Sequence, residues 1–319
     1  YDVIWISPSG YKNKDFKNIS LVGNFIPDFF FIGIYLKVFL TCIYNIKLIR
    51  DIDIVFAIRE YDAMSIFFNP FFKKAKKIFF SRGDVVSILK INLPDKNFIQ
   101  KIKDRFIILV YPTLQKIIYK KTDLTLLQTK FLKSTFERRL KCSSKNIKVL
   151  PNNCINKPQK KSKYLKLDNK KIIIGFAAPM YWSCKGLETI LEIYKELVDK
   201  KIFFKLEIAG KGPQEFKLKS ALHSVSDQHY KWNGWVNNID NFFNKIDILV
   251  VSSLYDSSPN LVFEALQKKK IIFASNISAH KEILKYNELL FSKKKIKNLI
   301  TKFEKISKSE VYKKNIEKK

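Results

Sequence analysis

Apolar runs of strand length alternate with longer amphipathic stretches along almost the whole chain. This alternation is typical of α/β domains, in which a helix follows each strand of a parallel sheet. The predicted strands cover residues 3–7, 52–58, 77–81, 124–128, 147–150, 171–176, 204–209, 230–232, 248–252 and 271–275. The main predicted helices cover residues 101–121, 186–199, 214–223, 238–245, 260–268 and 279–285. We therefore predict an α/β protein with parallel sheets.

A length of 319 residues suits two domains rather than one. Pro151-Asn152-Asn153 ends the last strand of the first half in turn chemistry, and residues 155–170 are polar, basic and without periodicity. We predict an N-terminal domain over 1–154, a linker over 155–170, a second domain over 171–292 and a Lys-rich helical tail over 293–319.

The chain carries 60 Lys and Arg against 29 Asp and Glu, a formal net charge of +31. Such an excess favours an anionic partner, namely nucleic acid, a membrane surface or a phosphorylated small molecule. The chain is also rich in Lys, Ile, Asn and Phe, which is the bias that an AT-rich genome imposes. This bias accounts for much of the Lys excess. The basic residues are spread over both domains and form no recognition motif, so nucleic acid is not the expected partner.

One basic cluster lies beside an apolar run. Lys73, Lys74, Lys76 and Lys77 follow residues 67–72, and this arrangement suits an anionic membrane surface. A solvated basic loop explains the same residues slightly better, so membrane attachment is a hypothesis. If the cluster binds a membrane, we expect the protein to be attached peripherally at the inner face of the plasma membrane.

The cysteines and histidines predict no metal site. Cys42, Cys142, Cys154 and Cys184 form no C-x-x-C pair, and the chain has only three histidines. A reducing cytoplasm fits this usage best.

The apolar run 29–40 contains Lys37 and is shorter than the roughly 20 residues that a membrane span needs. We predict that it forms a buried helix.

A polar loop between residues 253 and 260 places two carboxylates, Asp256 and Glu264, eight positions apart. It follows a predicted buried strand and runs into an apolar helix. A strand, a loop and a helix start present free backbone N–H groups to an anion. Glu264 lies about one and a half turns into the helix, where it can accept hydrogen bonds from vicinal hydroxyls such as a ribose diol. A solvated glutamate on an amphipathic helix is the equal alternative.

Similar loops follow the other strands of the second half, where open α/β sheets bind ligands. They are Gly175-Phe176-Ala177-Ala178 with Ser183-Cys184-Lys185-Gly186-Leu187, Ala209-Gly210-Lys211-Gly212-Pro213, Asn233-Gly234-Trp235-Val236 and His280-Lys281-Glu282-Ile283. In this order the series resembles the nucleotide-sugar domain of retaining glycosyltransferases of family four (glycosyl transferases group 1). The resemblance is strong over 171–285 and weaker before it. It implies the B-type architecture, in which two Rossmann-like domains face a cleft.

The resemblance implies a role for each matching position. Lys185 would neutralise the donor diphosphate and stabilise it as it leaves. Glu264 would hold the ribose hydroxyls. Asp256 would contact the donor sugar, although the family usually has the longer Glu there. The remaining donor-binding candidates are Gly186, Gly210, Gly212, Val236, Ser258, Pro259, Asn260 and Leu261.

The chain departs from the family pattern in three places. No Arg precedes Lys185 in residues 176–182, so Lys211 is a candidate to compensate. No His occurs in the first half, where Arg82 and Asp84 follow a predicted strand and become candidates for the acceptor side. The two residues could equally form a structural ion pair. Finally, the chain starts directly in a predicted strand, so we expect the first domain to lack the family's first strand and helix.

Taken together, the resemblance implies a retaining glycosyltransferase. It would move a sugar from a nucleotide-sugar donor to a glycan or lipid-linked acceptor in bacterial surface polysaccharide synthesis. The nucleotide-sugar is a co-substrate, and no cofactor or metal is expected. The alternatives are a non-catalytic or truncated relative, an epimerase or phosphorylase of the same fold, and a basic nucleic-acid-binding protein.

Overall fold

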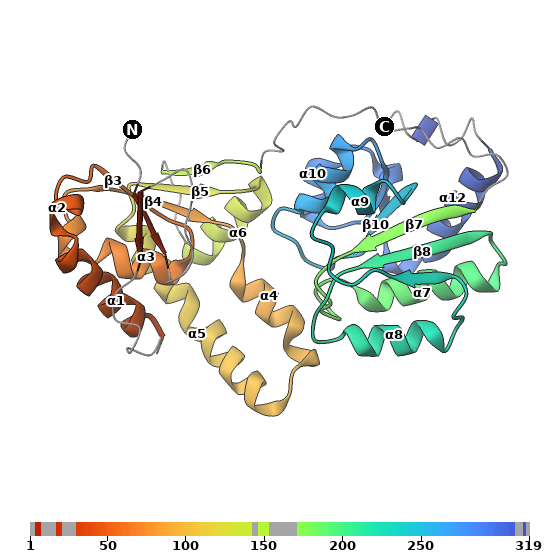
Figure 1. Cartoon of the computed structure of the whole chain (residues 1–319), viewed down its shortest axis with the longest axis horizontal. Coiled ribbons are helices and arrows are strands. Elements are labelled where there is room, and N and C mark those ends of the chain that lie inside the picture. The colour runs from red at the N-terminus through yellow and green to blue at the C-terminus, as the bar shows by residue number, and fades with distance from the viewer. Residues whose placement is uncertain are drawn as a thin grey trace. The chain divides into compact units, whose positions relative to one another are not determined.

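The computed structural model describes residues 4–7, 17–20, 30–141, 146–152, 171–309 and 315–316. The chain divides into two compact units (Figure 1). The first unit comprises Tyr1–Asp84 and Ile107–Leu150, and the second comprises Val85–Phe106 and Pro151–Lys319. The segment Val85–Phe106, predicted as part of the N-terminal domain, is therefore grouped with the second unit. The predicted linker 155–170 lies outside the described residues, as do Cys142 and Cys154.

The first unit contains a four-stranded parallel sheet in the order β3-β4-β5-β6, and β1 pairs with β2 in a separate parallel pair. The strands are β1 Ile4–Ser7, β2 Lys17–Ser20, β3 Ile54–Ala57, β4 Lys76–Ser81, β5 Leu124–Leu127 and β6 Ile147–Val149. The helices are α1 Phe30–Tyr44, α2 Ile46–Ile49, α3 Glu60–Phe67 and α6 Lys130–Leu140. The predicted strands match this sheet to within two residues, whereas β2 was not predicted.

The second unit is built on a six-stranded parallel sheet in the order β12-β11-β10-β7-β8-β9. Its strands are β7 Ile172–Ala177, β8 Phe204–Ala209, β9 Tyr230–Trp232, β10 Ile248–Val251, β11 Ile271–Ser275 and β12 Leu290–Phe291. Its helices are α4 Val85–Asn92, α7 Leu187–Asp199, α8 Glu215–His223, α9 Ile239–Phe243, α10 Asn260–Gln267, α11 Ser278–Ile283 and α12 Ile296–Lys308. Helix α5, Phe98–Lys120, begins in the second unit and ends in the first.

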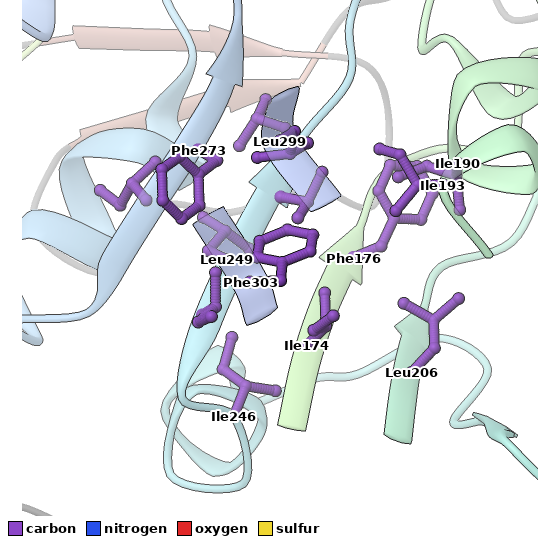
Figure 2. Close-up of a cluster of buried hydrophobic side chains, with 14 of the residues drawn as sticks. Ile174, Phe176, Ile190, Ile193, Leu206, Ile246, Leu249, Phe273, Leu299 and Phe303 are labelled. Carbon is purple, nitrogen blue, oxygen red and sulfur yellow. The ribbon is translucent and has the colours of Figure 1, made fainter. Parts of the chain in front are cut away.

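Helices cover both faces of the six-stranded sheet, which explains why its central strands are apolar at every position. All four residues of β10 are buried. Figure 2 shows Phe176 of β7 beside Ile190 and Ile193 of α7, while Phe303 of α12 lies beside the other strands of the core. Each such buried side chain stabilises the fold by about 1.5–3 kcal/mol.

The Lys-rich tail predicted over 293–319 contributes helix α12 to the core of the second unit. Five apolar residues of α12 are buried in the core of the second unit: Ile296, Leu299, Ile300, Phe303 and Ile306. The ring of Phe303 meets that of Phe273 in β11 edge to face, with centroids 5.5 Å apart. The lysines that intervene between these positions place the charge on the opposite face of α12.

The apolar run 29–40 contributes to helix α1, as predicted from its sequence. Val38 and Cys42 on this helix are buried. None of the helices that the structure describes combines the length and the apolar character needed to cross a bilayer.

Candidate functional site

The strand order of the second unit creates a switch point at β7. From β7 the chain proceeds to β8 and β9 on one side, and it then returns to β10 on the other side of β7. The loops after β7 and β10 consequently diverge at the carboxyl ends of two adjacent strands. Open α/β sheets bind ligands in the crevice at such a point. Lys185 lies in the first of these loops and Asp256 in the second.

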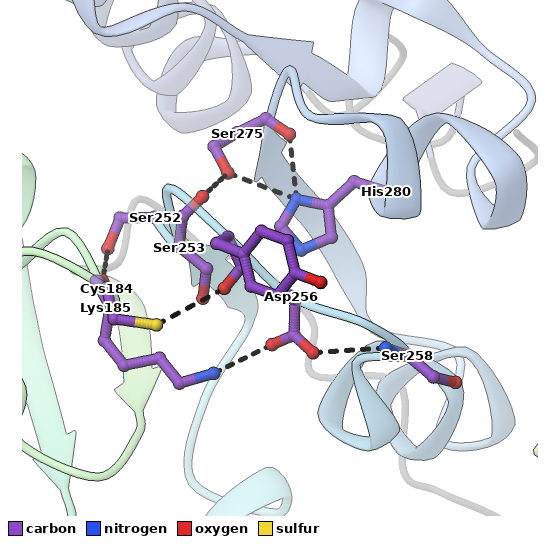
Figure 3. Close-up of polar contacts among 9 residues, drawn as sticks. Cys184, Lys185, Ser252, Ser253, Asp256, Ser258, Ser275 and His280 are labelled. Carbon is purple, nitrogen blue, oxygen red and sulfur yellow. Dashed lines mark hydrogen bonds and ion pairs between the residues drawn. The ribbon is translucent and has the colours of Figure 1, made fainter. Parts of the chain in front are cut away.

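Lys185 and Asp256 form an ion pair at this switch point (Figure 3). The Lys185 Nζ atom lies 2.8 Å from Asp256 Oδ2. The other carboxylate oxygen accepts the backbone N–H of Ser258 at 3.3 Å. The side chains of Lys185 and Asp256 are 21% and 17% exposed, so both remain accessible. An ammonium group has three N–H donors, which leaves two of them for an anionic ligand.

Gly186 allows the loop after β7 to approach the end of β10. Its φ of +62° lies in the left-handed region, where it caps the N-terminus of α7. A Cβ at this position would lie 2.1 Å from the carbonyl oxygen of Ser252. The Ser252 hydroxyl in turn donates to the carbonyl oxygen of Lys185 at 2.8 Å. The backbone around Lys185 is thus fixed directly against the neighbouring strand.

Two residues of Val85–Phe106, which are not part of the motifs described above, form hydrogen bonds with the same loop. The Asn92 Oδ1 atom accepts the N–H of Cys184 at 3.1 Å, and Asp95 Oδ2 accepts the N–H of Ser183 at 2.9 Å. These contacts immediately precede Lys185 and restrain its backbone. Sequence reasoning missed both residues, because partners 88 and 92 positions away leave no local signal.

Helix α10 carries the predicted ribose ligand, Glu264, in its second turn. Burial is the main cause that raises the pKa of Glu264, and the carboxylate of Asp240 raises it further. A hydroxyl that donates to this carboxylate would favour its charged form. At the start of the helix, Ser258 Oγ is buried and has no hydrogen-bond partner within the described residues. A buried hydroxyl without a partner is a reason to expect a ligand at this position.

The loop after β8 also lies close to the end of β7. The Gly210 N–H donates to the carbonyl oxygen of Gly234 at 2.7 Å. The φ of Gly210 is +135°, and a Cβ there would lie 1.9 Å from the carbonyl oxygen of Ala178. Gly212 and Lys211 follow, and Lys211 is exposed. This exposed cation remains the candidate that replaces the missing Arg.

The remaining donor-side candidates differ in their surroundings. Val236 and Leu261 pack against the edge of the core. Trp235 is 62% exposed, so it is not part of the core. The Oδ1 atom of Asn260 accepts a hydrogen bond from Asn152, and Pro259 stands at the N-cap of α10. No contact in the structure tests their predicted roles.

His280 lies behind the ion pair, although it is not among the predicted site residues. Its imidazole is fully buried, and Nδ1 lies 2.8 Å from the carbonyl oxygen of Ser275 (Figure 3). Burial lowers the pKa of His280, which favours the neutral imidazole. The charges of Asp256 and Lys185 act on the same pKa in opposite directions. The position of His280 in the motif series was the one sequence signal for this placement.

The acceptor-side candidates Arg82 and Asp84 are not brought together. Asp84 is 1% exposed and forms an ion pair with Arg139 of α6. Arg139 also donates to Gln115 at 3.2 Å, so Asp84 belongs to a buried polar network of the first unit. Arg82 is exposed, and the ion pairs between described residues include none from Arg82 to Asp84. An acceptor role is therefore better retained as a proposal for Arg82.

We expect Asp84→Asn to lower the free energy of unfolding of the first unit by about 2 kcal/mol, because it weakens a buried charge-assisted hydrogen bond to Arg139. Urea unfolding, monitored by far-UV circular dichroism, measures this change in the free energy of unfolding. Asp62→Asn is the matched control, since its pair with Arg59 is exposed. The control should change stability by less than about 1 kcal/mol. Equal effects of the two substitutions would contradict a structural role for Asp84.

No group of three or more His, Cys, Asp or Glu side chains is placed to hold a metal ion in the described parts of the chain. At the switch point Lys185 is paired with Asp256, so one positive charge is balanced by one negative charge. An anionic ligand there would gain from further positive charge, which is a reason to consider Lys211.

Comparison with known sequences finds one family model that matches part of the second unit. Residues 171–309 match the model for glycosyl transferases group 1. An uncharacterized glycosyltransferase of Methanocaldococcus jannaschii is 25% identical over 231 residues, which cover 69% of this chain and 55% of the relative. The chain thus spans about half the length of this curated relative.

Solved structures show the same fold at low sequence identity. TarM of S. aureus aligns with a TM-score of 0.68 and 16% identity, covering 88% of this chain and 53% of TarM. WaaG, a glycosyltransferase involved in lipopolysaccharide biosynthesis, aligns with a TM-score of 0.68 and 12% identity over 97% of this chain and 82% of WaaG. Anabaena HepE in complex with UDP-glucose gives 0.63 and 13%, over 87% and 76%. The likeness confirms the predicted α/β architecture with two Rossmann-like domains.

Proposed function

We propose that this chain is a retaining glycosyltransferase that uses a nucleotide-sugar donor, because residues 171–309 match the model for glycosyl transferases group 1. The observation that carries the proposal is the Lys185–Asp256 ion pair at the switch point of the six-stranded sheet. It places a fixed cation and a sugar-binding carboxylate beside the helix starts of α7 and α10. The acceptor is a glycan or a lipid-linked glycan.

Each part of the site has a chemical task in this proposal. Lys185 binds the diphosphate and stabilises the charge that develops as the bond to the sugar breaks. The backbone N–H groups at the start of α10 and the Ser258 hydroxyl bind the same anion. Glu264 accepts hydrogen bonds from the ribose hydroxyls. The departing diphosphate oxygen takes the acceptor proton on the same face of the sugar, which retains the anomeric configuration.

The neighbouring structures support a uridine nucleotide as the first donor to test. TarM has been crystallised with UDP, and HepE with UDP-glucose. The relation to WaaG supports a role in bacterial surface polysaccharide synthesis. Both assignments are proposals for this chain, because the likeness to these proteins establishes the fold.

An anionic membrane surface is the further partner in this proposal. The basic cluster of Lys73, Lys74, Lys76 and Lys77 is largely exposed, but Phe67 and Phe72 beside it are buried. Phe68 of the same run is 37% exposed, so this surface offers mainly charge with little exposed apolar area. It suits long-range attraction to anionic lipids better than insertion among them.

We expect UDP, or another single nucleotide, to stabilise the wild-type chain by roughly 2.7 kcal/mol when present at about 100 times its dissociation constant. Glu264→Ala should abolish most of this stabilisation, because the ribose loses its carboxylate ligand. Thermal unfolding with UDP, GDP, CDP, ADP and their common sugar conjugates measures both effects.

Glu196→Ala on α7 is the matched control, since it removes a helical glutamate away from the strand-end loops. It should leave the nucleotide response unchanged. Stabilisation by none of the nucleotides would favour the non-catalytic relative over the transferase. A response that survives in Glu264→Ala would remove Glu264 from the donor site.

A further inference from the structure

The ion pair between Lys185 and Asp256 places a negative charge directly beside the cation that an anionic ligand would use. The Lys185 Nζ atom lies 2.8 Å from Asp256 Oδ2, and the two side chains point toward each other from the loops after β7 and β10 (Figure 3). Among the described residues, Asp256 forms an ion pair with no other cation. A lysine that served only to bind a diphosphate would bind it more tightly without a carboxylate beside it. The pairing therefore calls for an explanation of its own.

The local backbone holds the carboxylate in this place. Asp256 Oδ1 accepts the N–H of Ser258 at 3.3 Å, two positions further along the chain, which is the arrangement of an Asx turn. On the other side of the pair, the carbonyl oxygen of Lys185 accepts the Ser252 hydroxyl at 2.8 Å, next to the left-handed Gly186. The carboxylate cannot withdraw far without breaking its turn. It therefore stays close to any anion that Lys185 binds.

An anion bound by Lys185 consequently lies near a fixed negative charge. A phosphate oxygen that accepts from Nζ at the usual separation of ~2.8 Å lies at most about 5.6 Å from Asp256 Oδ2. The side chains of Lys185 and Asp256 are only 21% and 17% exposed, so solvent screens the repulsion incompletely. His280 behind the pair does not offset this charge, because burial lowers the pKa of His280 and favours the neutral imidazole.

The donor and the product of a glycosyl transfer differ in what they bring to this place. The terminal phosphate of a free nucleoside diphosphate has a second ionisation with a pKa of about 6, so at pH 7 it carries about one more negative charge than a phosphate esterified to a sugar. The sugar ester brings hydroxyl groups instead, and a carboxylate accepts hydrogen bonds from them. A single carboxylate at this place thus favours the donor and disfavours the product.

We propose that Asp256 selects the nucleotide-sugar donor over the free nucleoside diphosphate product, because it repels the additional product charge at Lys185. The proposal rests on the proposed function, since it needs a nucleotide-sugar as the donor. Selectivity here comes from a repulsive element as well as an attractive one. After transfer, the hydroxyls that donated to Asp256 leave with the sugar, while the negative charge beside it increases. The protein then releases its product more readily, which limits product inhibition.

The test compares the dissociation constants of UDP and UDP-glucose, measured by isothermal titration calorimetry, for the wild type and Asp256→Asn. The amide keeps the shape of the side chain and an oxygen for the Ser258 N–H, but it removes the charge. Asp256→Asn should bind UDP about tenfold more tightly, because a like charge at roughly 5 Å is lost. UDP-glucose should gain little, because it also loses an acceptor for its hydroxyls. The matching ligands of another base replace these two if the thermal-unfolding panel responds to that base.

Uridine diphosphate methyl ester separates the effect of charge from that of the sugar hydroxyls. It carries the same charge as UDP-glucose and none of the hydroxyls. Because only UDP has the additional charge, the affinity of UDP relative to the methyl ester should rise about tenfold in Asp256→Asn.

Glu304→Gln is the matched control. It removes one carboxylate from a pair with Lys308 at 2.7 Å on α12, so it changes the net charge of the protein by the same amount. It should leave all three dissociation constants unchanged. Asp256→Ser is the second test variant if Asp256→Asn does not fold, since its hydroxyl also accepts the Ser258 N–H.

The outcomes separate this proposal from the proposed function. Equal changes in affinity for UDP and UDP-glucose, in either direction, would show that the ion pair only shapes the site and would overturn the selection by Asp256. Equal changes for UDP and its methyl ester would overturn it as well. In both cases binding of UDP-glucose by the wild type would leave the transferase proposal intact. Binding of no nucleotide by the wild type would remove the transferase proposal, and the selection with it.

Discussion

Lys185→Gln should lower kcat for sugar transfer by about a thousandfold, the size expected when one preorganised electrostatic group is removed from the leaving charge. The substitution keeps the side-chain stem and the backbone contacts of the loop but removes the cation that is paired with Asp256. The effect should fall more on kcat than on KM, because the diphosphate carries more charge on its leaving oxygen in the transition state than in the bound donor. The donor for this assay is the one that the thermal-unfolding experiment identifies. The rate at which UDP is released from that donor measures kcat and KM.

Lys195→Gln is the matched control for Lys185→Gln. Lys195 lies on α7, the helix that follows the loop of Lys185, and is exposed. It should retain kcat within about twofold if charge at the switch point, rather than overall charge, is the cause. A Lys185→Gln enzyme with near-normal kcat would show that another cation, such as Lys211, carries the diphosphate.

Gly186→Ala should lower the free energy of unfolding of the second unit by about 3–4 kcal/mol. A left-handed backbone at φ +62° costs a non-glycine residue about 1–2 kcal/mol. The new Cβ also lies 2.1 Å from the backbone carbonyl oxygen of Ser252, which has to move. Urea unfolding gives the change in stability, and the same shift should weaken UDP binding because it displaces Lys185.

Gly234→Ala separates the two contributions. Gly234 has nearly the same φ, +64°, but the atom nearest to an added Cβ is Lys211 Cε at 3.9 Å. This variant should lose only about 1–2 kcal/mol, from the backbone conformation alone. Equal losses at the two glycines would contradict the close approach of the Gly186 loop to β10.

The sequence predicted every strand of the four-stranded sheet and all but β12 of the six-stranded sheet, because these strands have a strong local signal. Residues 248–252 and 271–275 are uninterrupted apolar runs between turn signals, and they form β10 and β11 within one residue of the prediction. β2, Lys17–Ser20, and β12, Leu290–Phe291, were not predicted, because a short polar segment and a two-residue strand carry no periodicity. Pairing with a neighbour, rather than their own pattern, makes them strands.

The candidate site was predictable where function rests on residues within one loop. The interval between Asp256 and Glu264 appears in the sequence, and both lie on the loop and helix expected. The contacts between loops could not be predicted, because they depend on how the chain returns to the same sheet edge. Examples are the pair between Lys185 and Asp256, 71 positions apart, and the pair between Asp84 and Arg139, 55 positions apart.

The contacts of Asn92 and Asp95 with the loop before Lys185 limit where this chain can be joined to a relative in a chimeric enzyme. Rossmann-like domains are attractive parts for chimeric enzymes, in which one half supplies the donor preference and the other the acceptor preference. A junction at residue 151 would separate Ser183 and Cys184 from the side chains that accept their N–H groups. A recombination scheme for this chain should therefore transfer Val85–Phe106 together with Pro151–Lys319, so that the second unit keeps the side chains that hold the loop before Lys185.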